Sequence, residues 1–311
     1  MRALGLPFVL ASALATALGC AARAPVQPAD PPTPVIEVQE GHAVTAQTLL
    51  HLDGSGSHAA GGGTVTAYQW SVDAPVGAAG SFEPSEIAAS PTFRVDVVGG
   101  YTFHLDVLDG ATASLQAADY QVTVTPATPF SVELTWVTPG DPDETDTGPE
   151  AGSDVDLHLV QPGQPTAQNS PDLDGDGEPD PYFDTRLDCF WFNPNPDWGA
   201  TGTANNPRMD RDDTDGAGPE VISVAQPQSN LTYVVAVHYW RSHGYGPVTA
   251  SVRVLLDGEE ALSRADVALQ EKDLWHVATI DTTTMAVELM APPGGTGDWI
   301  THDYDPPGFT G

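Results

Sequence analysis

A short acidic loop near the middle of the chain has the residue pattern that points most directly to chemistry. It reads Asp172-Leu-Asp-Gly-Asp-Gly-Glu-Pro-Asp-Pro-Tyr-Phe-Asp184, with aspartates at 172, 174, 176, 180 and 184. Calcium takes about six to eight hard oxygen ligands, and acids at alternate positions of one loop can surround a single ion. Gly177 permits the sharp turn that this requires. The pattern predicts a calcium site formed by Asp172, Asp174, Asp176, Asp180 and Asp184, with a merely solvated acidic loop as the alternative.

The spacing of this loop matches the first half of an EF-hand loop. Phe183 stands where an EF-hand has its bidentate glutamate, and we predict no flanking helices. The loop is more similar to the helix-free calcium loops of thrombospondin type-3 repeats. That resemblance implies calcium as its ligand.

A second acidic pattern lies on a predicted strand, Asp154-Val-Asp-Leu-His-Leu159. Because side chains alternate along a strand, the three apolar residues share one face, and Asp154, Asp156 and His158 share the other. Asp154 and Asp156 are candidate metal ligands. Taken alone, this segment favours the simpler interpretation of a polar strand face.

A third pattern is Asn205-Asn-Pro-Arg-Met-Asp-Arg-Asp-Asp-Thr-Asp-Gly-Ala-Gly-Pro-Glu220. Asp210, Asp212, Asp213 and Asp215 could complete a metal site with the strand carboxylates. Equally, Arg208 and Arg211 could pair with these aspartates in a structural network. The sequence leaves both possibilities open.

These patterns belong to a region of unusually dense negative charge. About twenty of the 43 acidic residues fall between positions 141 and 220, against three arginines. Carboxylates held this close repel one another unless a cation lies among them. The formal charge of the whole chain is -33, which excludes nucleic acid as a partner, because phosphate binding needs lysine and arginine.

The elements that must position these residues are predicted to be strands. Phe130–Trp136 and Val248–Leu256 alternate apolar and polar residues, and Leu231–Trp240 is apolar on both faces. No amphipathic helix is evident. We therefore predict an all-β fold with a second β-sandwich over residues 128–290. The Gly/Pro-rich tail, 291–311, is either disordered or lies across that sandwich.

A first β-sandwich domain is predicted for residues 35–126. In Tyr101–Leu108 the side chains of Tyr101, Phe103, Leu105 and Val107 share one face, and Trp70 is expected to fill the core. The order of segments resembles a polycystic-kidney-disease (PKD) domain, an immunoglobulin-like sandwich. The matching stretches are Leu52-Asp-Gly-Ser-Gly-Ser57, Ala67-Tyr-Gln-Trp70, Gly100–Gly110 and Val122-Thr-Val-Thr125, whereas the usual signature loop is replaced by Trp70-Ser-Val-Asp-Ala-Pro75.

The second domain also carries a resemblance, over roughly residues 130 to 256. The strand Asp154–Leu159, the turn Asp215–Glu220 and the strand Leu231–Trp240 resemble those of the YfaP-type family of secreted bacterial proteins. The insertion with the acidic loop and the aromatic run Cys189–Trp198 departs from the short family form. The resemblance implies a surface β-sandwich module.

The N-terminus has the features of a secretion signal. Residues 1–20 comprise one arginine, an apolar run and Ala17-Leu18-Gly19-Cys20, which resembles a bacterial lipobox. The resemblance implies acylation of Cys20 and a membrane anchor at the cell envelope, with 21–34 as a linker; an ordinary cleaved signal is the alternative. Cys189 would then be a small buried apolar residue.

Three functions remain open from the sequence. The first is a non-catalytic, calcium-binding lipoprotein that binds a polysaccharide or protein ligand or acts as a scaffold. The second is a carbohydrate-active hydrolase that uses a carboxylate pair, although no nucleophile elbow or zinc-protease motif is present. The third is a subunit of a surface assembly. The aromatic cluster Phe190, Trp191, Phe192 and Trp198 favours a loop anchor over a sugar-stacking platform.

Overall fold

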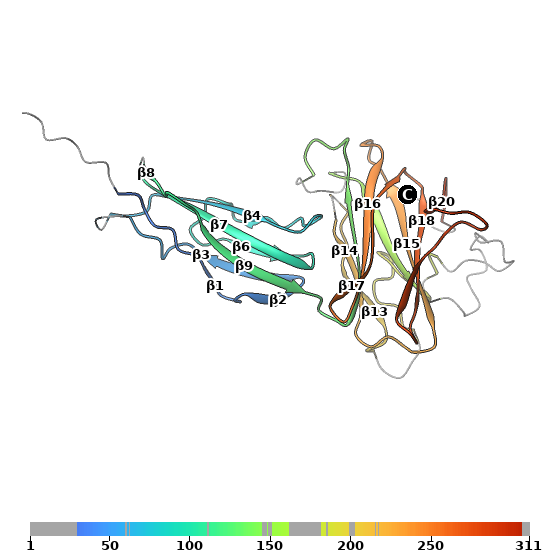
Figure 1. The fold of residues 1–311 in the computed structure, drawn as a ribbon. Helices are drawn as coiled ribbons and strands as arrows, with labels where there is room; N and C mark the ends of the chain where they lie inside the picture. Colours follow the sequence, from blue (N-terminus) through green and yellow to red (C-terminus); the bar gives the residue numbers. More distant parts are fainter. Residues whose placement is uncertain are drawn as a thin grey trace, which may run out of the picture.

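The computed structural model describes two β-sandwiches that follow one another along the chain (Figure 1). The described residues are 30–59, 61, 63–110, 112–144, 148, 151–161, 182–184, 186–198, 203–214, 216 and 218–306. They contain no α-helix, so no helix among them is long and apolar enough to cross a membrane. The predicted all-β class and tandem sandwich architecture are confirmed.

The first sandwich is immunoglobulin-like. Its strands are β1 (Glu37–Val38), β2 (Ala43–Thr45), β3 (Thr48–Asp53), β4 (Ala67–Asp73), β5 (Phe82–Glu83), β6 (Thr92–Val95), β7 (Gly99–Asp109), β8 (Thr112–Ala113) and β9 (Ala118–Thr125). One sheet has the order β1-β3-β6-β5 and the other β2-β9-β7-β4, with β8 beside β7. These orders correspond to the two sheets of an immunoglobulin constant-type domain, apart from the added strand β2, which runs parallel to β9.

Two side chains support this assignment. Trp70 on β4 is 2% exposed in the core, where its Nε1 donates to the carbonyl oxygen of Ala88 at 2.9 Å. The hydroxyl of Tyr101, near the start of β7, lies 3.1 Å from the carbonyl oxygen of Val97. A buried tryptophan on the strand that corresponds to β4 is typical of this fold. So is a tyrosine near the start of the strand that corresponds to β7, with its hydroxyl bonded back to the preceding corner. The predicted inward face of β7 is also buried.

The second sandwich contains the acidic region. Its strands are β10 (Phe130–Val137), β11 (Asp154–Val160), β12 (Asp188–Cys189), β13 (Pro207–Arg211), β14 (Glu220–Val224), β15 (Thr232–Arg241), β16 (Val248–Leu256), β17 (Glu259–Leu269), β18 (Leu274–Asp281), β19 (Ala286–Leu289) and β20 (Trp299–Thr301). The two sheets have the orders β13-β14-β10-β16-β17 and β12-β11-β15-β18-β19. The apolar faces of both sheets form one large core between them.

Strand β10 is more buried than its alternating pattern predicts. Ser131 and Glu133 lie on the face opposite the core, yet both are almost fully buried. The carboxylate of Glu133 accepts a hydrogen bond from the backbone amide of Val98 in the first sandwich at 3.1 Å. The prediction of a half-buried strand is wrong here because the first sandwich covers the polar face.

The segment after residue 290 lies across the second sandwich, at least over its described part. β20 pairs with β18, and the backbone amide of Tyr304 donates to the carbonyl oxygen of Lys272 at 2.8 Å. Of the two arrangements that the sequence left open, the described residues adopt the ordered one. The second sandwich therefore extends past residue 290.

Candidate metal centre

Three carboxylates from separate parts of the second sandwich converge at one point. Asp156 lies on β11, Asp212 directly follows β13, and Glu220 begins β14. One carboxylate oxygen of each lies within 4.8 Å of the corresponding oxygens of the other two. We call Asp156, Asp212 and Glu220 the acidic triad. Its geometry is one that could hold a metal ion.

The edge of β11 explains why Glu220 reaches this point. β12 covers that edge only at Leu159 and Val160, so the backbone amide of Leu157 has no strand partner on this side. Glu220 belongs to the opposite sheet, and its Oε2 accepts a hydrogen bond from the Leu157 amide at 2.6 Å. The glutamate therefore forms a hydrogen bond between the two sheets, and this places its carboxylate beside Asp156.

The predicted alternation along β11 is confirmed, but its polar face is not exposed. Val155, Leu157 and Leu159 lie in the core between the sheets. Asp156 and His158 lie on the other face and are 2% and 0% exposed. A second apolar cluster covers that face; it consists of Val160, Tyr182, Phe183, Leu187, Phe190, Ala236, Leu274 and Tyr304. Asp156 is therefore held away from bulk water.

Two carboxylate oxygens at this site are buried without a partner among the described residues. They are Oδ2 of Asp156 and Oδ1 of Asp154, which lies two residues earlier on the same face. A buried polar atom that makes no hydrogen bond costs about 1–3 kcal/mol, and more when the group is charged. A cation among these oxygens would remove that cost.

The metal-free site strongly disfavours full ionisation. Burial, followed by the charges of Asp154 and Asp212, raises the pKa of Asp156 well above its ordinary value. Burial and the neighbouring Asp156 and Asp212 raise the pKa of Glu220 in the same way. Burial and Asp212 also raise the pKa of Asp154 to about 7. Each shift arises because several negative charges share a space with little water.

The donor set indicates the class of ion that would fit. The triad offers only carboxylate oxygens. Hard oxygen donors suit cations such as Ca²⁺ and Mg²⁺, whereas zinc sites use histidine and cysteine. The residues present therefore fit a hard divalent cation.

The described residues of the segment 210–215 divide between the acidic triad and ion pairs. Asp212 joins the triad, whereas Asp210 pairs with Arg208 and Asp213 pairs with Arg211. Asp213 also contributes its backbone amide, which donates to Oε1 of Glu220 at 3.4 Å. Asp215 lies outside the described residues. The triad carboxylate Asp212 therefore lies directly beside the ion pair between Arg211 and Asp213.

Most of the predicted calcium loop cannot be compared with the structure, because Asp172, Asp174, Asp176 and Asp180 lie outside the described residues. Asp184 is described, and its Oδ2 lies 3.0 Å from a guanidinium nitrogen of Arg186. It is not a member of the triad.

Glu220 was absent from the set of predicted ligands. The available signal was its place at the end of the Asp215–Glu220 turn, directly before an apolar strand. Nothing in the local sequence indicates that this strand faces the open edge of β11. The pairing that brings the two together depends on the register of the sandwich.

A separate polar cluster lies further along the covered face of β11. Nδ1 of His158 and Oδ2 of Asp188 are 2.7 Å apart, and the backbone amide of Phe183 donates to the same oxygen at 2.7 Å. Across the strand pair, burial lowers the pKa of His238 to about 3. Within the described residues, this cluster forms no further group of three convergent metal-ligating atoms.

The aromatic run after β12 mainly anchors its loop. The ring of Phe190 stacks on His158 at 5.2 Å, and Trp198 packs against Tyr233 at 5.0 Å. Phe192 remains 55% exposed. Cys189 is a free, fully buried thiol within the core, in agreement with its predicted role.

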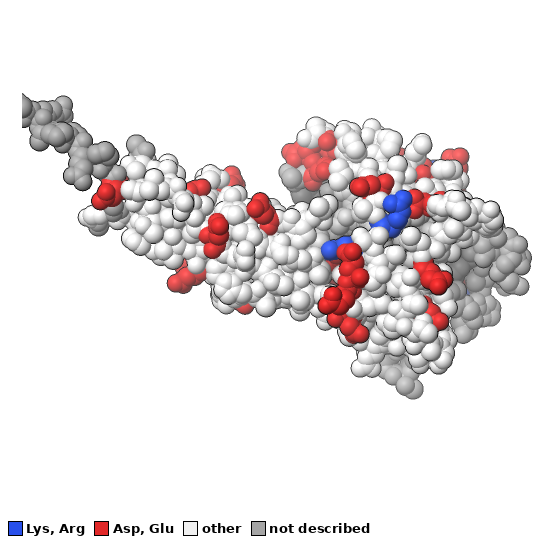
Figure 2. Space-filling model, in the orientation of Figure 1, with Lys and Arg blue, Asp and Glu red and all other residues white. Residues whose placement is uncertain are grey.

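Among the charged groups on the visible surface of both sandwiches, acidic ones outnumber basic ones (Figure 2). This distribution agrees with the composition, in which ten basic residues stand against 43 acidic ones. A surface of this kind attracts cations and repels polyanions.

Comparison with known proteins adds little to this description. No model of a known protein family matches the chain, and no curated protein matches it. Among solved structures, the chain is similar to native alpha-2-macroglobulin from Escherichia coli, spanning domain MG7 to the C-terminus, with 16% identity and a TM-score of 0.23. The match covers 45% of this chain and 24% of that one. The fold assignment accordingly rests on strand order and side-chain contacts.

Proposed function

We propose that this protein is a calcium-binding, non-catalytic module of a bacterial cell envelope, anchored through an acylated Cys20. In this proposal the two sandwiches bind a polysaccharide or protein ligand at the surface, or act as a scaffold for it. The observation that carries the proposal is the acidic triad, with a buried and unpartnered Oδ2 on Asp156. A cation is the simplest group that would satisfy it.

Calcium is a better candidate than magnesium for this site. Magnesium demands near-ideal octahedral geometry and usually retains several waters, whereas calcium accepts more protein oxygens in flexible arrangements. The triad is assembled from three separate segments, and two of its members are almost fully buried. Three carboxylates from separate segments, one of them the exposed Asp212, form an irregular all-oxygen site of the kind that calcium accepts more readily than magnesium.

Calorimetric titration tests the proposal directly. The chain from residue 21 onward keeps every described residue and should release or absorb heat on titration with calcium. Asp156→Asn should weaken calcium affinity by at least about tenfold, because it removes a charged ligand. Asp210→Asn is the matched control: Asp210 lies in the same segment but pairs with Arg208, so its loss should leave the affinity unchanged.

A second measurement locates the ion. Changing Asp174 and Asp176 together to asparagine should remove any additional site in the acidic loop while leaving the site of the triad intact. No heat with calcium, together with equal melting temperatures in chelator and in millimolar calcium, would contradict the proposal.

One observation favours the alternative of a carboxylate-dependent hydrolase. Asp154 has a pKa raised to about 7, which is suitable for a general acid near neutral pH. However, Asp154 lies outside the acidic triad, and three convergent carboxylates are the arrangement expected for a shared cation. Turnover on a polysaccharide panel that is abolished by Asp154→Asn would support the hydrolase instead.

A further inference from the structure

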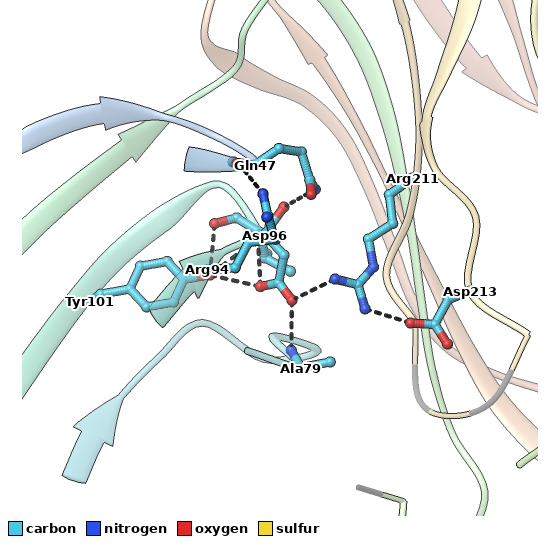
Figure 3. A network of polar contacts seen from close by, with 8 residues as sticks. Gln47, Ala79, Arg94, Asp96, Tyr101, Arg211 and Asp213 are labelled. Carbon is cyan, nitrogen blue, oxygen red and sulfur yellow. Dashed lines mark hydrogen bonds and ion pairs between the residues drawn. The ribbon is translucent and has the colours of Figure 1, made fainter. Parts of the chain in front are cut away.

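The joint between the two sandwiches contains a buried carboxylate, Asp96 of the first sandwich (Figure 3). Its Oδ1 accepts hydrogen bonds from the Val97 amide at 3.0 Å and the Tyr101 hydroxyl at 3.1 Å. Its Oδ2 accepts one from the Ala79 amide at 3.0 Å. The first sandwich thus holds Asp96 in a fixed orientation toward the second.

The positive charge that meets Asp96 comes from the second sandwich. A guanidinium nitrogen of Arg211 lies 3.5 Å from Oδ2 of Asp96, and the other terminal nitrogen lies 2.5 Å from Oδ2 of Asp213 (Figure 3). Arg211 therefore bridges a carboxylate of each sandwich. Because Asp96 is fully buried, loss of this bridge would leave an uncompensated charge in the joint.

The bridging arginine is the direct chain neighbour of a residue of the acidic triad. Arg211, Asp212 and Asp213 are consecutive: the first contacts Asp96, the second supplies a triad oxygen, and the third holds Arg211. The Asp213 amide also donates to Glu220 of the triad. Since adjacent Cα atoms are about 3.8 Å apart, Asp212 cannot move far without displacing the guanidinium beside it.

A second set of contacts links the other side of the triad to the same joint. In the sheet register, Glu220 on β14 lies opposite Leu134 on β10. The residue before Leu134, Glu133, accepts a hydrogen bond from the Val98 amide of the first sandwich. Arg253 on β16 bonds Glu133 and also donates to the carbonyl oxygen of Val98 at 2.9 Å. The sheet that carries Glu220 therefore touches the first sandwich through two further strands, β10 and β16.

We infer that the cation held by the acidic triad controls the rigidity of the joint between the sandwiches. With the cation bound, residues 211–213 are fixed and Arg211 holds Asp96. Without it, nothing ties the three carboxyl groups to one another, so Asp212 is free to move and the bridge to Asp96 loosens. This inference rests on the proposed cation site, and it assigns that site a mechanical role.

Distance measurements between spin labels test the inference. Leu115 in the first sandwich is 84% exposed and Leu289 in the second is 50% exposed, so Leu115→Cys and Leu289→Cys provide attachment points. Cys189 is buried and will not compete for the label. In the chain from residue 21 onward, removing calcium with chelator should broaden the distance distribution roughly twofold, as expected when a hinge is released.

Two variants distinguish the effect of losing the Arg211 bridge from the effect of losing the cation. Arg211→Gln removes the bridge but no triad ligand, so the distribution should stay broad in calcium while calcium still binds with measurable heat. Arg264→Gln is the matched control, because Arg264 pairs with Asp298 within the second sandwich, and it should retain the narrow distribution in calcium.

The possible outcomes are distinguishable. If calcium binds and the distribution is equally narrow with and without it, the inference is overturned and the proposed function stands. If calorimetric heat is absent, the proposed function fails and the inference fails with it. The chelator comparison uses the labelled chain without further substitution, so a variant that misfolds does not weaken the test.

Discussion

At the scale of single residues, the second sandwich keeps several ionisable groups in their neutral form by burying them. His276 is the clearest example away from the acidic triad. It is 1% exposed, its Nδ1 lies 3.0 Å from the Tyr182 hydroxyl, and its ring stacks on Trp299 at 4.0 Å. Burial lowers the pKa of this histidine from 6.5 to about 4.

This shift predicts a loss of stability in mild acid. Below pH 6.5 the unfolded chain takes up a proton at His276, whereas the folded chain does not until about pH 4. The contribution of His276 to the free energy of unfolding should therefore be constant above pH 6.5, decrease by at most about 3 kcal/mol between pH 6.5 and 4, and level off below. Urea unfolding of His276→Gln should show a smaller decline across this range.

The control for this prediction is His42→Gln, which changes an exposed histidine of the first sandwich. It should retain the full decline. An unchanged pH profile for His276→Gln would show that His276 is not responsible.

At the scale of elements, the open edge of β11 is the feature on which the candidate site depends. An uncovered strand edge leaves backbone groups without partners. Here the Leu157 amide is satisfied by the side chain of Glu220 instead of a neighbouring strand. One glutamate thus has both a structural role and a place in the triad.

The two roles can be separated by comparing Glu220→Gln with Glu220→Ala. Glutamine retains an acceptor for the Leu157 amide but lacks the charge, so it should fold normally and lose calcium affinity. Alanine leaves the buried amide unpaired and should lower the free energy of unfolding by about 1–3 kcal/mol more than glutamine, measured in chelator. Equal stabilities for the two variants would show that the hydrogen bond does not support the edge.

At the scale of the whole molecule, the two sandwiches are joined by close backbone contact as well as by ion pairs. Gly77 of the first sandwich has a φ of +81°, and a Cβ placed there would lie 2.3 Å from Cγ2 of Thr135 on β10. This position tolerates only a hydrogen atom. The joint is therefore a packed interface with specific steric requirements.

Gly77→Ala should open this joint. Its methyl group cannot fit beside Thr135, so the cross-joint hydrogen bond from the Val98 amide to Glu133 should weaken and the exchange of that amide should accelerate at least about tenfold. Gly41→Ala is a matched control, because Gly41 has the same φ of +81° but no atom within 4 Å of the point where a Cβ would lie. Exchange that is slow in both variants would show that the contact at Gly77 does not hold the joint.

The sequence by itself determined the all-β class and the inward faces of the main strands. These follow from local rules, because alternation along a strand and turn residues between strands depend only on neighbours in the chain. The buried Trp70 and the apolar face of β7 were readable in this way. So was the placement of Asp154 and Asp156 opposite the core residues of β11.

Only the tertiary structure decided which carboxylates meet. Asp156, Asp212 and Glu220 come from three strands or strand ends, and their convergence depends on how the two sheets pack at an open edge. The burial of Glu133 and the bridge from Arg211 to Asp96 likewise require knowing that one sandwich covers the other. Contacts between residues distant in sequence are set by packing and register, which no local pattern encodes.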